Sequence, residues 1–270
     1  MTKSVGVIGC GWLGFPLAKS LIKKGYSVSG TTTSENKLEL LEEAGISPYR
    51  VQLSENDIFG DISAFLKNLE VLILNVPPRL RGKGEKGNYV KKMELLHREI
   101  TNSPIEKVIF ISSTSVYGDI SGTITEETEP RPNTESGRQL LQCEKIFQNN
   151  AHLETTIIRF GGLIGPGRHP VTMLSRRENL TDGDAPVNLI HLDDCIGIIT
   201  SILMFDQWEE VFNGVYPYHP AKRDYYRSAA LKRNIKIPDY QLFKSIKHKK
   251  ITTSKDFLLN FYAFQTSIDQ

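Results

Sequence analysis

An α/β fold with a doubly wound parallel sheet is predicted by three features of the 270-residue chain. Short apolar runs alternate with segments of helical periodicity through the first half of the sequence. Two of those runs, 71–74 and 107–112, are almost continuously apolar, which is typical of parallel strands that are covered on both faces. A glycine-rich turn joins the first apolar run to the first helical segment. Together these features favour strand–helix–strand units wound around one sheet.

The expected elements follow from hydrophobic spacing and from the residues that end each segment. Leucine, alanine and isoleucine recur at helical spacing after Gly14, and Gly25 is suited to end that helix. Asp61 is suited to cap a later helix, while Pro77 and Pro78 end the strand before them. We expect strands at 5–8, 26–31, 49–53, 71–74, 107–112 and 155–159. We expect helices at 15–24, 37–44, 58–69, 89–100 and 135–149.

The turn at residues 9–14 has the spacing Gly-x-Gly-x-x-Gly and stands between the first strand and the first helix. Gly9 allows a sharp turn, Gly11 has no Cβ to hold a phosphate off the backbone, and Gly14 lets the helix pack close to the sheet. The helix start also offers free N–H groups and the positive end of its dipole. In this position the pattern favours a dinucleotide pyrophosphate site over a plain glycine turn. The expected contact residues are Gly9, Cys10, Gly11, Trp12, Leu13 and Gly14.

The regular alternation ends near residue 165, and this divides the chain into two parts. Residues 1–165 are expected to form an NAD(P)-binding domain of the Rossmann type. Residues 166–270 carry shorter elements separated by prolines. We expect them to form a small capping lobe that binds the substrate and includes segments that return to the Rossmann core.

Composition and charge exclude several classes of protein. Hydrophobic residues make up 39% of the chain, enough for a core, and the net charge of +2 gives no reason to expect a nucleic-acid or membrane partner. The first strand begins too early to leave room for a signal peptide, and no apolar run is long enough to span a membrane. Cys10, Cys143 and Cys195 are too widely spaced for a disulfide framework or a metal site. We therefore expect a cytoplasmic protein without a metal.

The end of the second strand distinguishes NAD from NADP. In NAD-binding folds, an acidic residue near this place holds the ribose 2′-hydroxyl. Here the residues are Thr32, Thr33 and Ser34, and Lys37 follows one helical turn later. The missing carboxylate favours NADP over NAD, although no arginine stands ready at this end. The alternative is that the threonines only cap the next helix.

Further cofactor contacts are expected where a later strand ends, because open α/β sheets bind ligands at the carboxyl edge of their strands. Asn75, Val76 and Pro77 follow the run at 71–74 and are expected to line the adenosine-ribose side. The basic loop at 79–88 either closes over an anionic ligand or is simply solvated.

Three further stretches carry a resemblance to a known family. Residues 112–118 read Ser-Ser-Thr-Ser-Val-Tyr-Gly, residues 159–168 read Arg-Phe-Gly-Gly-Leu-Ile-Gly-Pro-Gly-Arg, and residues 188–194 read Asn-Leu-Ile-His-Leu-Asp-Asp. In this order they resemble the extended short-chain dehydrogenases/reductases, which include nucleotide-sugar epimerases and dehydratases. Residues 5–25 alone are similar to the opening of β-hydroxyacid dehydrogenases, but this chain lacks the long helical domain those enzymes need.

The resemblance implies an active site of Ser, Tyr and Lys, and only the serine has a match. Ser113 takes the place of the serine that orients the substrate oxygen. The family's Tyr-x-x-x-Lys falls on Ser136 and Leu140, so the acid/base phenol and the lysine that lowers its pKa are both missing. A serine hydroxyl is too short and too weak an acid to replace the phenol. These departures resemble the atypical branch of the family, which keeps the cofactor fold and loses the usual active site.

Several side chains admit two interpretations. Ser113 either contacts a nicotinamide or substrate, or satisfies the backbone at a strand end. Tyr117 either substitutes as the acid or packs a wall of the site. Arg168 either binds a phosphate or carboxylate of the substrate or bridges the two lobes. Gly161, Gly162 and Leu163 follow another strand end and are expected to pass near the nicotinamide, and Ser112 is a further expected cofactor contact.

Three other groups of polar residues are weaker candidates. His191, Asp193 and Asp194 favour a carboxylate–histidine pair in a hinge over a metal site, because no further ligand is spaced to complete one. Arg138 either binds an anion near the vacated tyrosine position or lies on the helix surface. The lysine-rich stretch 244–250 is expected to be a solvated face.

Two functions stay open at this point. The chain is expected to bind NADP (or NAD) and a small-molecule substrate, either as an oxidoreductase or epimerase with a non-standard site, or as a non-catalytic sensor of the cofactor. Family members often pair through the helices that flank the sheet, which implies a homodimer by analogy only.

Overall fold

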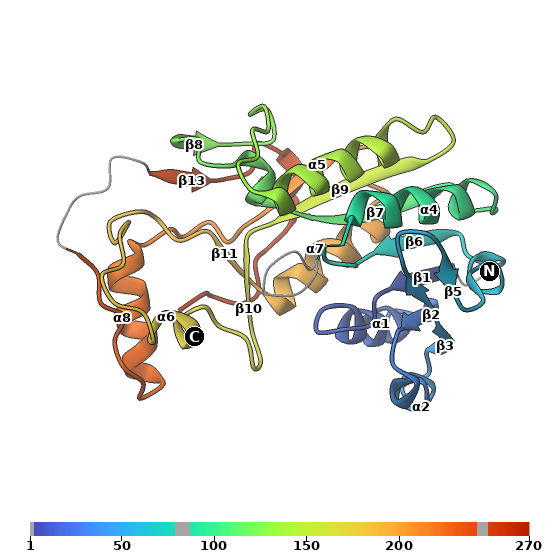
Figure 1. The fold of residues 1–270 in the computed structure, drawn as a ribbon, viewed down its shortest axis with the longest axis horizontal. Coiled ribbons are helices and arrows are strands. Elements are labelled where there is room, and N and C mark those ends of the chain that lie inside the picture. Colours follow the sequence, from blue (N-terminus) through green and yellow to red (C-terminus); the bar gives the residue numbers. More distant parts are fainter. Residues whose placement is uncertain (1–2, 79–86, 242–247, 270) are drawn as a thin grey trace.

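The computed structural model of the chain describes residues 3–78, 87–241 and 248–269. Its centre is a seven-stranded sheet in the order β12-β9-β7-β6-β1-β2-β3, and every neighbouring pair is parallel (Figure 1). The prediction of a doubly wound α/β fold is confirmed. The strands are β1 (Ser4–Ile8), β2 (Ser27–Thr32), β3 (Ser47–Arg50), β6 (Val71–Leu74), β7 (Lys107–Ser113), β9 (Glu154–Phe160) and β12 (Val211–Gly214).

Helices cover both faces of this sheet, each over its own hydrophobic core. One core contains side chains of α1, α2 and α7, and the other contains side chains of α3, α4 and α5. Because β6 is covered on both sides, all of its residues are buried, as the continuous apolar run predicts. The helices are α1 (Gly14–Lys23), α2 (Leu38–Glu43), α3 (Ile62–Leu66), α4 (Tyr89–Thr101), α5 (Glu135–Gln148) and α7 (Leu192–Met204).

The prediction of one helix over 58–69 is wrong at its first residues. The chain there forms a short strand, β5 (Ile58–Phe59), which pairs antiparallel with β4 (Gln52–Leu53). Gly60 then turns the chain with a φ of +99°, a conformation that favours glycine. Asp61 follows and caps α3 by accepting a hydrogen bond of 2.8 Å from the backbone of that helix. The helix therefore starts only after Asp61.

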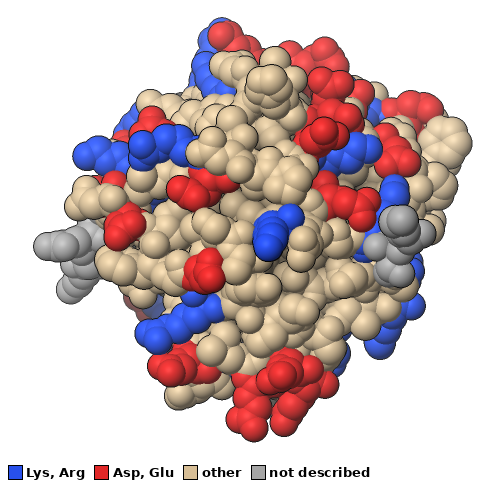
Figure 2. All heavy atoms as spheres, turned by 90° about the vertical axis from the view of Figure 1, so that its right-hand side faces the viewer, with Lys and Arg blue, Asp and Glu red and all other residues tan. Residues whose placement is uncertain are grey.

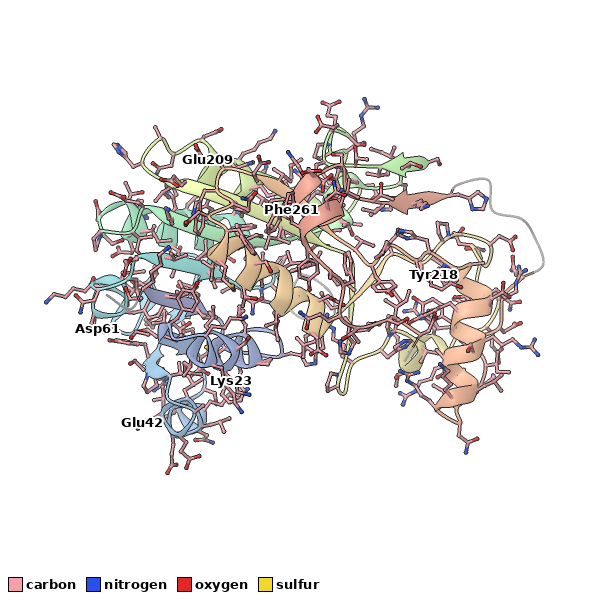
Figure 3. The ribbon with its side chains drawn as sticks, turned by 180° about the vertical axis from the view of Figure 1, so that it is seen from behind. Lys23, Glu42, Asp61, Glu209, Tyr218 and Phe261 are labelled. Atoms are coloured by element: carbon pink, nitrogen blue, oxygen red, sulfur yellow. The ribbon has the colours of Figure 1, made fainter. Side chains whose placement is uncertain are left out.

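The chain after β9 contributes both to the sheet and to a smaller lobe. The helix α7 packs on one face of the sheet, and β12 forms its edge strand. The remaining segments build a lobe with a third core of its own. Figure 3 shows α8, with Tyr218 near it, at the opposite end of the molecule from Glu42 and Asp61. The elements outside the large sheet are β8 (Gly122–Ile124), β10 (Gly162–Ile164), α6 (Val171–Leu174), β11 (Leu189–His191), α8 (Lys222–Lys232), β13 (Lys249–Ile251) and a π-helical turn (Phe257–Phe261).

The surface carries both signs of charge. Figure 2 shows lysine and arginine interspersed with aspartate and glutamate over the face on the right of Figure 1. Among the described residues, no helix is both long and apolar enough to cross a bilayer. Part of the basic loop expected at 79–88, namely 79–86, and the lysines at 244 and 247 lie outside the described residues.

Candidate functional site

The glycine loop is held in place by hydrogen bonds from two neighbouring strand ends. The Gly9 amide donates to Thr31 Oγ1 at 3.0 Å, and the Cys10 amide donates to the Thr31 carbonyl at 2.9 Å. From the other side, Asn75 Nδ2 donates to the Gly9 carbonyl at 3.0 Å. The side chain of Asn75 thus positions the loop. This hydrogen bond places the end of β6 next to the glycine loop.

Two of the three glycines are required by close approach of the backbone. Gly9 has a φ of +98°, and a Cβ there would lie 2.6 Å from the Asn75 carbonyl oxygen. A Cβ at Gly14 would lie 2.2 Å from the Gly9 carbonyl oxygen, so any side chain there would push α1 away from the loop. These two positions therefore need glycine for the fold itself.

Gly11 differs, because a Cβ there would meet no atom within 4 Å. The residue is exposed at the carboxyl edge of the sheet, just before α1. Among the described residues, the amides of Trp12 and Leu13 have no hydrogen-bond acceptor. Open space, free N–H groups and a helix N-terminus are what a pyrophosphate needs. The side chains of Cys10 and Leu13, in contrast, are buried in the core, and burial raises the pKa of the Cys10 thiol to about 12.

Trp12 joins the glycine loop to the start of the lobe. Its indole Nε1 donates to the Pro166 carbonyl at 2.9 Å. The guanidinium carbon of Arg168 lies 4.9 Å from the centre of the indole ring, as in a cation–π contact. The Arg168 side chain is exposed beside the loop. The arrangement gives Arg168 the bridging contact that the sequence left open, and it also leaves the guanidinium accessible to an anion.

The end of β2 carries hydroxyl groups, as the sequence indicates. Thr32 is buried, and its Oγ1 accepts a hydrogen bond of 3.2 Å from the Ser34 amide, while the neighbouring Thr33 is exposed. The sheet register places Arg50 of β3 beside Thr32. Arg50 Nη1 lies 3.1 Å from a carboxylate oxygen of Glu35, and both side chains are exposed. Neither residue was identified from the sequence, because only the pairing of β2 with β3 brings them to this corner.

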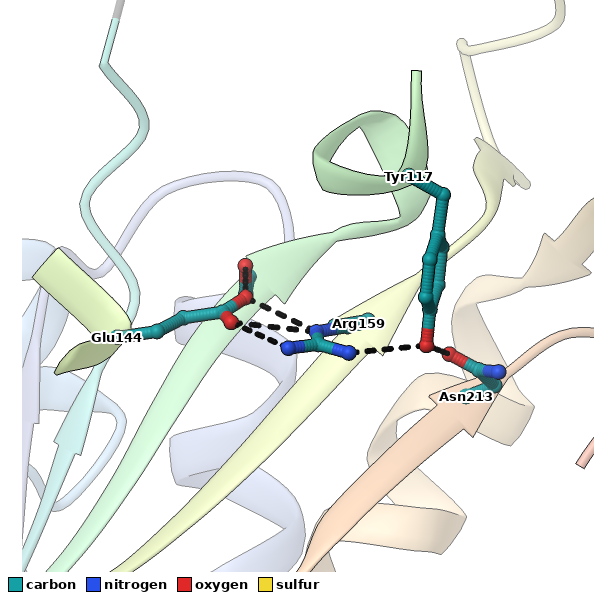
Figure 4. Close-up of polar contacts among 5 residues, drawn as sticks. Tyr117, Glu144, Arg159 and Asn213 are labelled. Carbon is teal, nitrogen blue, oxygen red and sulfur yellow. Dashed lines mark hydrogen bonds and ion pairs between the residues drawn. The ribbon is translucent and has the colours of Figure 1, made fainter. Parts of the chain in front are cut away.

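Tyr117 is enclosed in a buried polar network. Its ring is fully buried, and its hydroxyl donates to Asn213 Oδ1 at 2.9 Å and accepts from Arg159 Nη1 at 2.9 Å (Figure 4). Burial raises the pKa of the phenol, although the charge of Arg159 opposes the shift. A phenol with both hydrogen-bonding positions occupied and no exposed surface is not placed to donate a proton to a ligand. The geometry therefore gives no support to Tyr117 as a substitute acid.

The rest of this network is an ion pair beneath the strand ends. Arg159 Nη2 lies 2.7 Å from a carboxylate oxygen of Glu144, and Arg159 Nε donates to both oxygens at 3.2 Å. The hydroxyl of Ser112 donates to the same carboxylate. Glu144 is fully buried and Arg159 is 5% exposed. Ser112 is thus occupied inside the core, and the structure does not bring its hydroxyl to the exposed edge.

Ser113 is half-buried at the end of β7. Its Oγ accepts a hydrogen bond of 3.2 Å from the Ser115 amide and caps the turn that follows. A Cβ on Gly137 would lie 2.7 Å from the Ser115 carbonyl oxygen, so α5 packs directly on this turn. The close packing sets Ser136 near the turn, where the resemblance expects a tyrosine. Leu140, in place of the lysine, is 4% exposed and belongs to the core.

At the ends of β6 and β9, contacts within the protein account for several of the residues expected to bind the cofactor. Tyr89 is buried, and its hydroxyl donates to the Val76 carbonyl at 2.8 Å, while Pro77 is exposed. A Cβ on Gly161 would lie 2.7 Å from the Asn188 carbonyl oxygen, and one on Gly162 would lie 2.6 Å from Leu189 Cδ2. Gly161 is thus explained by close backbone contact with the segment before β11, whereas Gly162 lies against the flexible end of the Leu189 side chain. The requirement at Gly161 is independent of a ligand.

The acidic residues around α7 have structural partners. Asp194 is fully buried and accepts hydrogen bonds from the Tyr262 hydroxyl at 2.9 Å and from the Gln265 amide at 2.7 Å. His191 Nδ1 accepts from the Asp193 amide and lies 3.3 Å from its carboxylate. Within the part of the chain that the structure describes, no group of three or more histidine, cysteine, aspartate or glutamate residues is arranged to hold a metal ion.

A cavity of about 500 Å³ lies at the amino ends of the sheet strands. It is bordered by Ser4 and Val71, where β1 and β6 begin, and by Lys107 and Trp208. The ammonium of Lys107 lies 5.0 Å from the centre of the Trp208 ring. Because the glycine loop lies at the carboxyl ends of the strands, this cavity is separate from the candidate dinucleotide site.

A parallel sheet with a glycine loop at the start of its first crossover helix defines a dinucleotide-binding α/β protein. Comparison with protein families narrows the class, because the model of the NAD dependent epimerase/dehydratase family matches residues 5–213. The chain belongs to this family. It is similar to Protein YeeZ of Escherichia coli (strain K12), with 35% identity over 241 residues that cover 88% of this chain and 87% of the relative.

Further comparisons agree with the family and the fold. The chain is 24% identical over 222 residues to the uncharacterized UDP-glucose epimerase YtcB of Bacillus subtilis (strain 168), covering 72% of this chain and 70% of the relative. The solved structure of MoeE5 in complex with UDP-glucose and NAD superposes with a TM-score of 0.78 at 19% identity, covering 98% and 95% of the two chains. UDP-glucuronic acid 4-epimerase from Bacillus cereus in complex with NAD gives 0.78 at 22% identity, covering 98% and 93%.

Proposed function

We propose that the chain binds NAD(P)(H) at the carboxyl edge of the sheet, with the pyrophosphate on residues 9–14. The observation that carries this proposal is the exposed, open position of Gly11 beside the free amides of Trp12 and Leu13. The named neighbours MoeE5 and UDP-glucuronic acid 4-epimerase are complexes with NAD, which supports the cofactor class. A crystal of the chain soaked with cofactor tests the proposal directly, and a pyrophosphate found away from residues 9–14 would overturn it.

We further propose that NADP(H) is preferred over NAD(H). The hydroxyl residues at the end of β2 offer no carboxylate for a ribose 2′-hydroxyl, and Arg50 supplies a guanidinium at the same corner. Glu35 holds that guanidinium in an exposed ion pair at 3.1 Å. A 2′-phosphate is a stronger partner for an arginine than a single carboxylate, because it offers more acceptor oxygens and more negative charge.

Titration with both reduced cofactors tests this preference. We expect NADPH to bind at least about tenfold more tightly than NADH, and Arg50→Gln to remove most of that difference while leaving NADH binding unchanged. Arg131→Gln is a matched control, because Arg131 also forms an exposed ion pair, with Glu129 at 3.2 Å, and lies far from β2 in the chain. Tenfold tighter binding of NADH to the unmodified chain would contradict the preference.

The geometry favours a protein that binds or senses the cofactor over one that carries out the family's tyrosine-dependent reaction. Proton transfer by a positioned group contributes roughly 10²–10⁴-fold to such reactions. The positions of that group and its lysine are filled by Ser136 and the buried Leu140, and the hydroxyl of Tyr117 is occupied. We therefore propose a protein that binds the dinucleotide together with a second small molecule and responds to both.

A second candidate function is an oxidoreductase or epimerase with a non-standard acid. The half-buried hydroxyl of Ser113 favours it, because this side chain lies at the end of β7, just before the turn on which α5 packs. The fluorescence of bound NADPH distinguishes the two functions when aldehydes, ketones and sugar nucleotides are added. Turnover that is lost in Ser113→Ala would support the enzyme. Tight binding without turnover across the panel would support the sensor.

A further inference from the structure

The lobe carries most of the positive charge of the chain. Its segments 166–191 and 217–250 contain thirteen lysines and arginines against five acidic residues. The whole chain has a net charge of only +2, so the rest of the chain has an excess of acidic residues. The molecule therefore has a basic part and an acidic part. This distribution favours association with a surface of opposite charge.

The outer face of α8 is basic and exposed. The inner face of this helix is buried in the lobe core. On the outer face, Arg227 and Leu231 lie one helical turn apart and are exposed, Leu231 by 60%. Lys232 and Arg233 follow at the end of the helix, whereas the acidic Asp224 lies in its first turn. Within the described residues these three cations form no ion pair, because the ion pairs of the lobe involve other side chains.

The neighbouring α6 extends the basic surface of the lobe. It packs against α8 in the lobe core. Arg176 and Arg177 follow α6 and are exposed, and Arg177 Nη2 lies 3.8 Å from the sulfur of Met173, which is 57% exposed. Arginine and methionine are enriched at protein interfaces, whereas nucleic-acid interfaces are more polar. A surface that mixes cations with exposed aliphatic side chains therefore suits an acidic protein surface.

An acidic surface of matching character lies on α2. Glu39, Glu42 and Glu43 are exposed, and in the part of the chain that the structure describes they form no ion pair, unlike the nearby Glu35. Leu40 lies among them and is 47% exposed. The turn before the helix adds one charge of each sign. The helix α2 therefore presents negative charge around an exposed leucine, as α8 presents positive charge around one.

The positions of α2 and α8 allow both surfaces to be used in one symmetric pair. Figure 1 shows the two helices at opposite ends of the long axis, and both reach the same long side of the molecule. A two-fold axis perpendicular to this view exchanges the two ends. The helix α8 of one copy then meets α2 of the other, and the same contact forms a second time. In contrast, none of the large apolar side chains exposed on the described chain lies on α4 or α5.

We propose that α8 of the lobe docks on α2 of a second copy of this chain, so that two copies form an antiparallel dimer with two equivalent contacts. The three cations of α8 face the three glutamates of α2, and Leu231 packs against Leu40 of the second copy. The contact does not depend on the proposed function. Because its attraction is largely electrostatic, the dimer weakens as the salt concentration rises.

Sedimentation velocity of the full chain at low and high salt tests this dimer. In dilute buffer we expect a dimer at about 100 μM chain, a concentration that fills an interface of micromolar affinity. We expect dissociation in about 1 M NaCl, where charges are screened beyond about 3 Å. Glu39→Lys combined with Glu43→Lys should weaken dimerisation at least about tenfold, and so should Arg227→Glu combined with Arg233→Glu.

Mixing these two charge-reversed variants tests the pairing of the surfaces directly. The first variant is basic on both surfaces and the second is acidic on both, so a mixed dimer regains both contacts although neither variant pairs with itself. We expect the mixture to dimerise nearly as well as the unmodified chain. Glu94→Lys combined with Glu106→Lys is the matched control, because both glutamates are exposed and lie outside α2 and α8. This control changes the net charge equally and should leave dimerisation unchanged.

An unmodified chain that stays monomeric in dilute buffer would overturn the proposal. A dimer that survives both reversals, or that is lost equally in the control, would also overturn it. Binding of polyglutamate or of a DNA duplex to α8 of a monomeric chain would assign the basic surface to another partner and exclude the dimer. Thermal melting of each variant identifies any loss of fold, and the salt dependence of the unmodified chain is a test that needs no variant.

Discussion

Glu144→Gln is expected to lower the free energy of unfolding by about 3 to 5 kcal/mol, because it leaves the charge of Arg159 buried without a partner. Glu144 is fully buried and accepts hydrogen bonds from Arg159 and from Ser112. Although burial acts to lower it, the pKa of Arg159 is raised by the hydrogen bonds and charge of Glu144. The variant loses these contributions, but an arginine side chain is not deprotonated in proteins, so the guanidinium stays charged. Urea unfolding, followed by circular dichroism, measures the change.

The double variant Glu144→Gln with Arg159→Met separates the charge from the packing. Removing both charges takes away the uncompensated ion, so we expect the double variant to be more stable than Glu144→Gln alone. Glu178→Gln, which breaks an exposed ion pair with Lys236, is a control expected to leave the unfolding midpoint unchanged. A loss below about 1 kcal/mol in Glu144→Gln would contradict the importance assigned to the pair.

Gly11→Val is expected to abolish measurable cofactor binding while leaving the fold intact. An added side chain at Gly11 meets no protein atom within 4 Å, so it projects into the space proposed for the pyrophosphate. Loss of close backbone contact with a charged phosphate removes several charge-assisted hydrogen bonds, each worth about 1.5–3 kcal/mol. Fluorescence titration with NADPH measures the binding, and thermal melting measures the fold.

Gly14→Ala is the informative comparison, because its Cβ would lie 2.2 Å from the Gly9 carbonyl oxygen. We expect this variant to lose stability as well as binding, whereas Gly11→Val should lose binding alone. Gly11→Ala should fall between Gly11→Val and the unmodified chain. Unchanged NADPH affinity in Gly11→Val, with a normal melting curve, would exclude residues 9–14 as the phosphate site.

The fold was predictable because its strongest signals are local. The run at 71–74 is apolar at every position, and β6 is buried at every position. The glycine spacing at 9–14 fixes the first strand, turn and helix within a few residues. The hairpin of β4 and β5 was missed because strands of two residues have no periodicity to detect. Gly60 was the available signal for a break in the expected helix.

The site was harder to predict, because its decisive contacts join residues far apart in the chain. The sequence identifies Tyr117 as a phenol near the expected site, but its burial depends on Asn213 and Arg159. Arg159, a charged residue in an apolar strand, was a usable signal that a buried partner had to exist. Arg50 had no such signal, since it reaches the end of β2 only through the sheet register.

The chain has two tryptophans, one at the carboxyl ends of the sheet strands and one at their amino ends. Each end of the sheet therefore has its own fluorescent side chain. Trp12 lies in the glycine loop, and its indole donates a hydrogen bond to the Pro166 carbonyl. Trp208 lies beside Lys107, at the amino ends of the strands. Reduced nicotinamide absorbs where tryptophan emits, so a dinucleotide bound at the loop quenches the nearer indole more strongly. Trp208→Phe would leave an emission signal that follows the loop alone, and Trp12→Phe would leave one that follows the far edge.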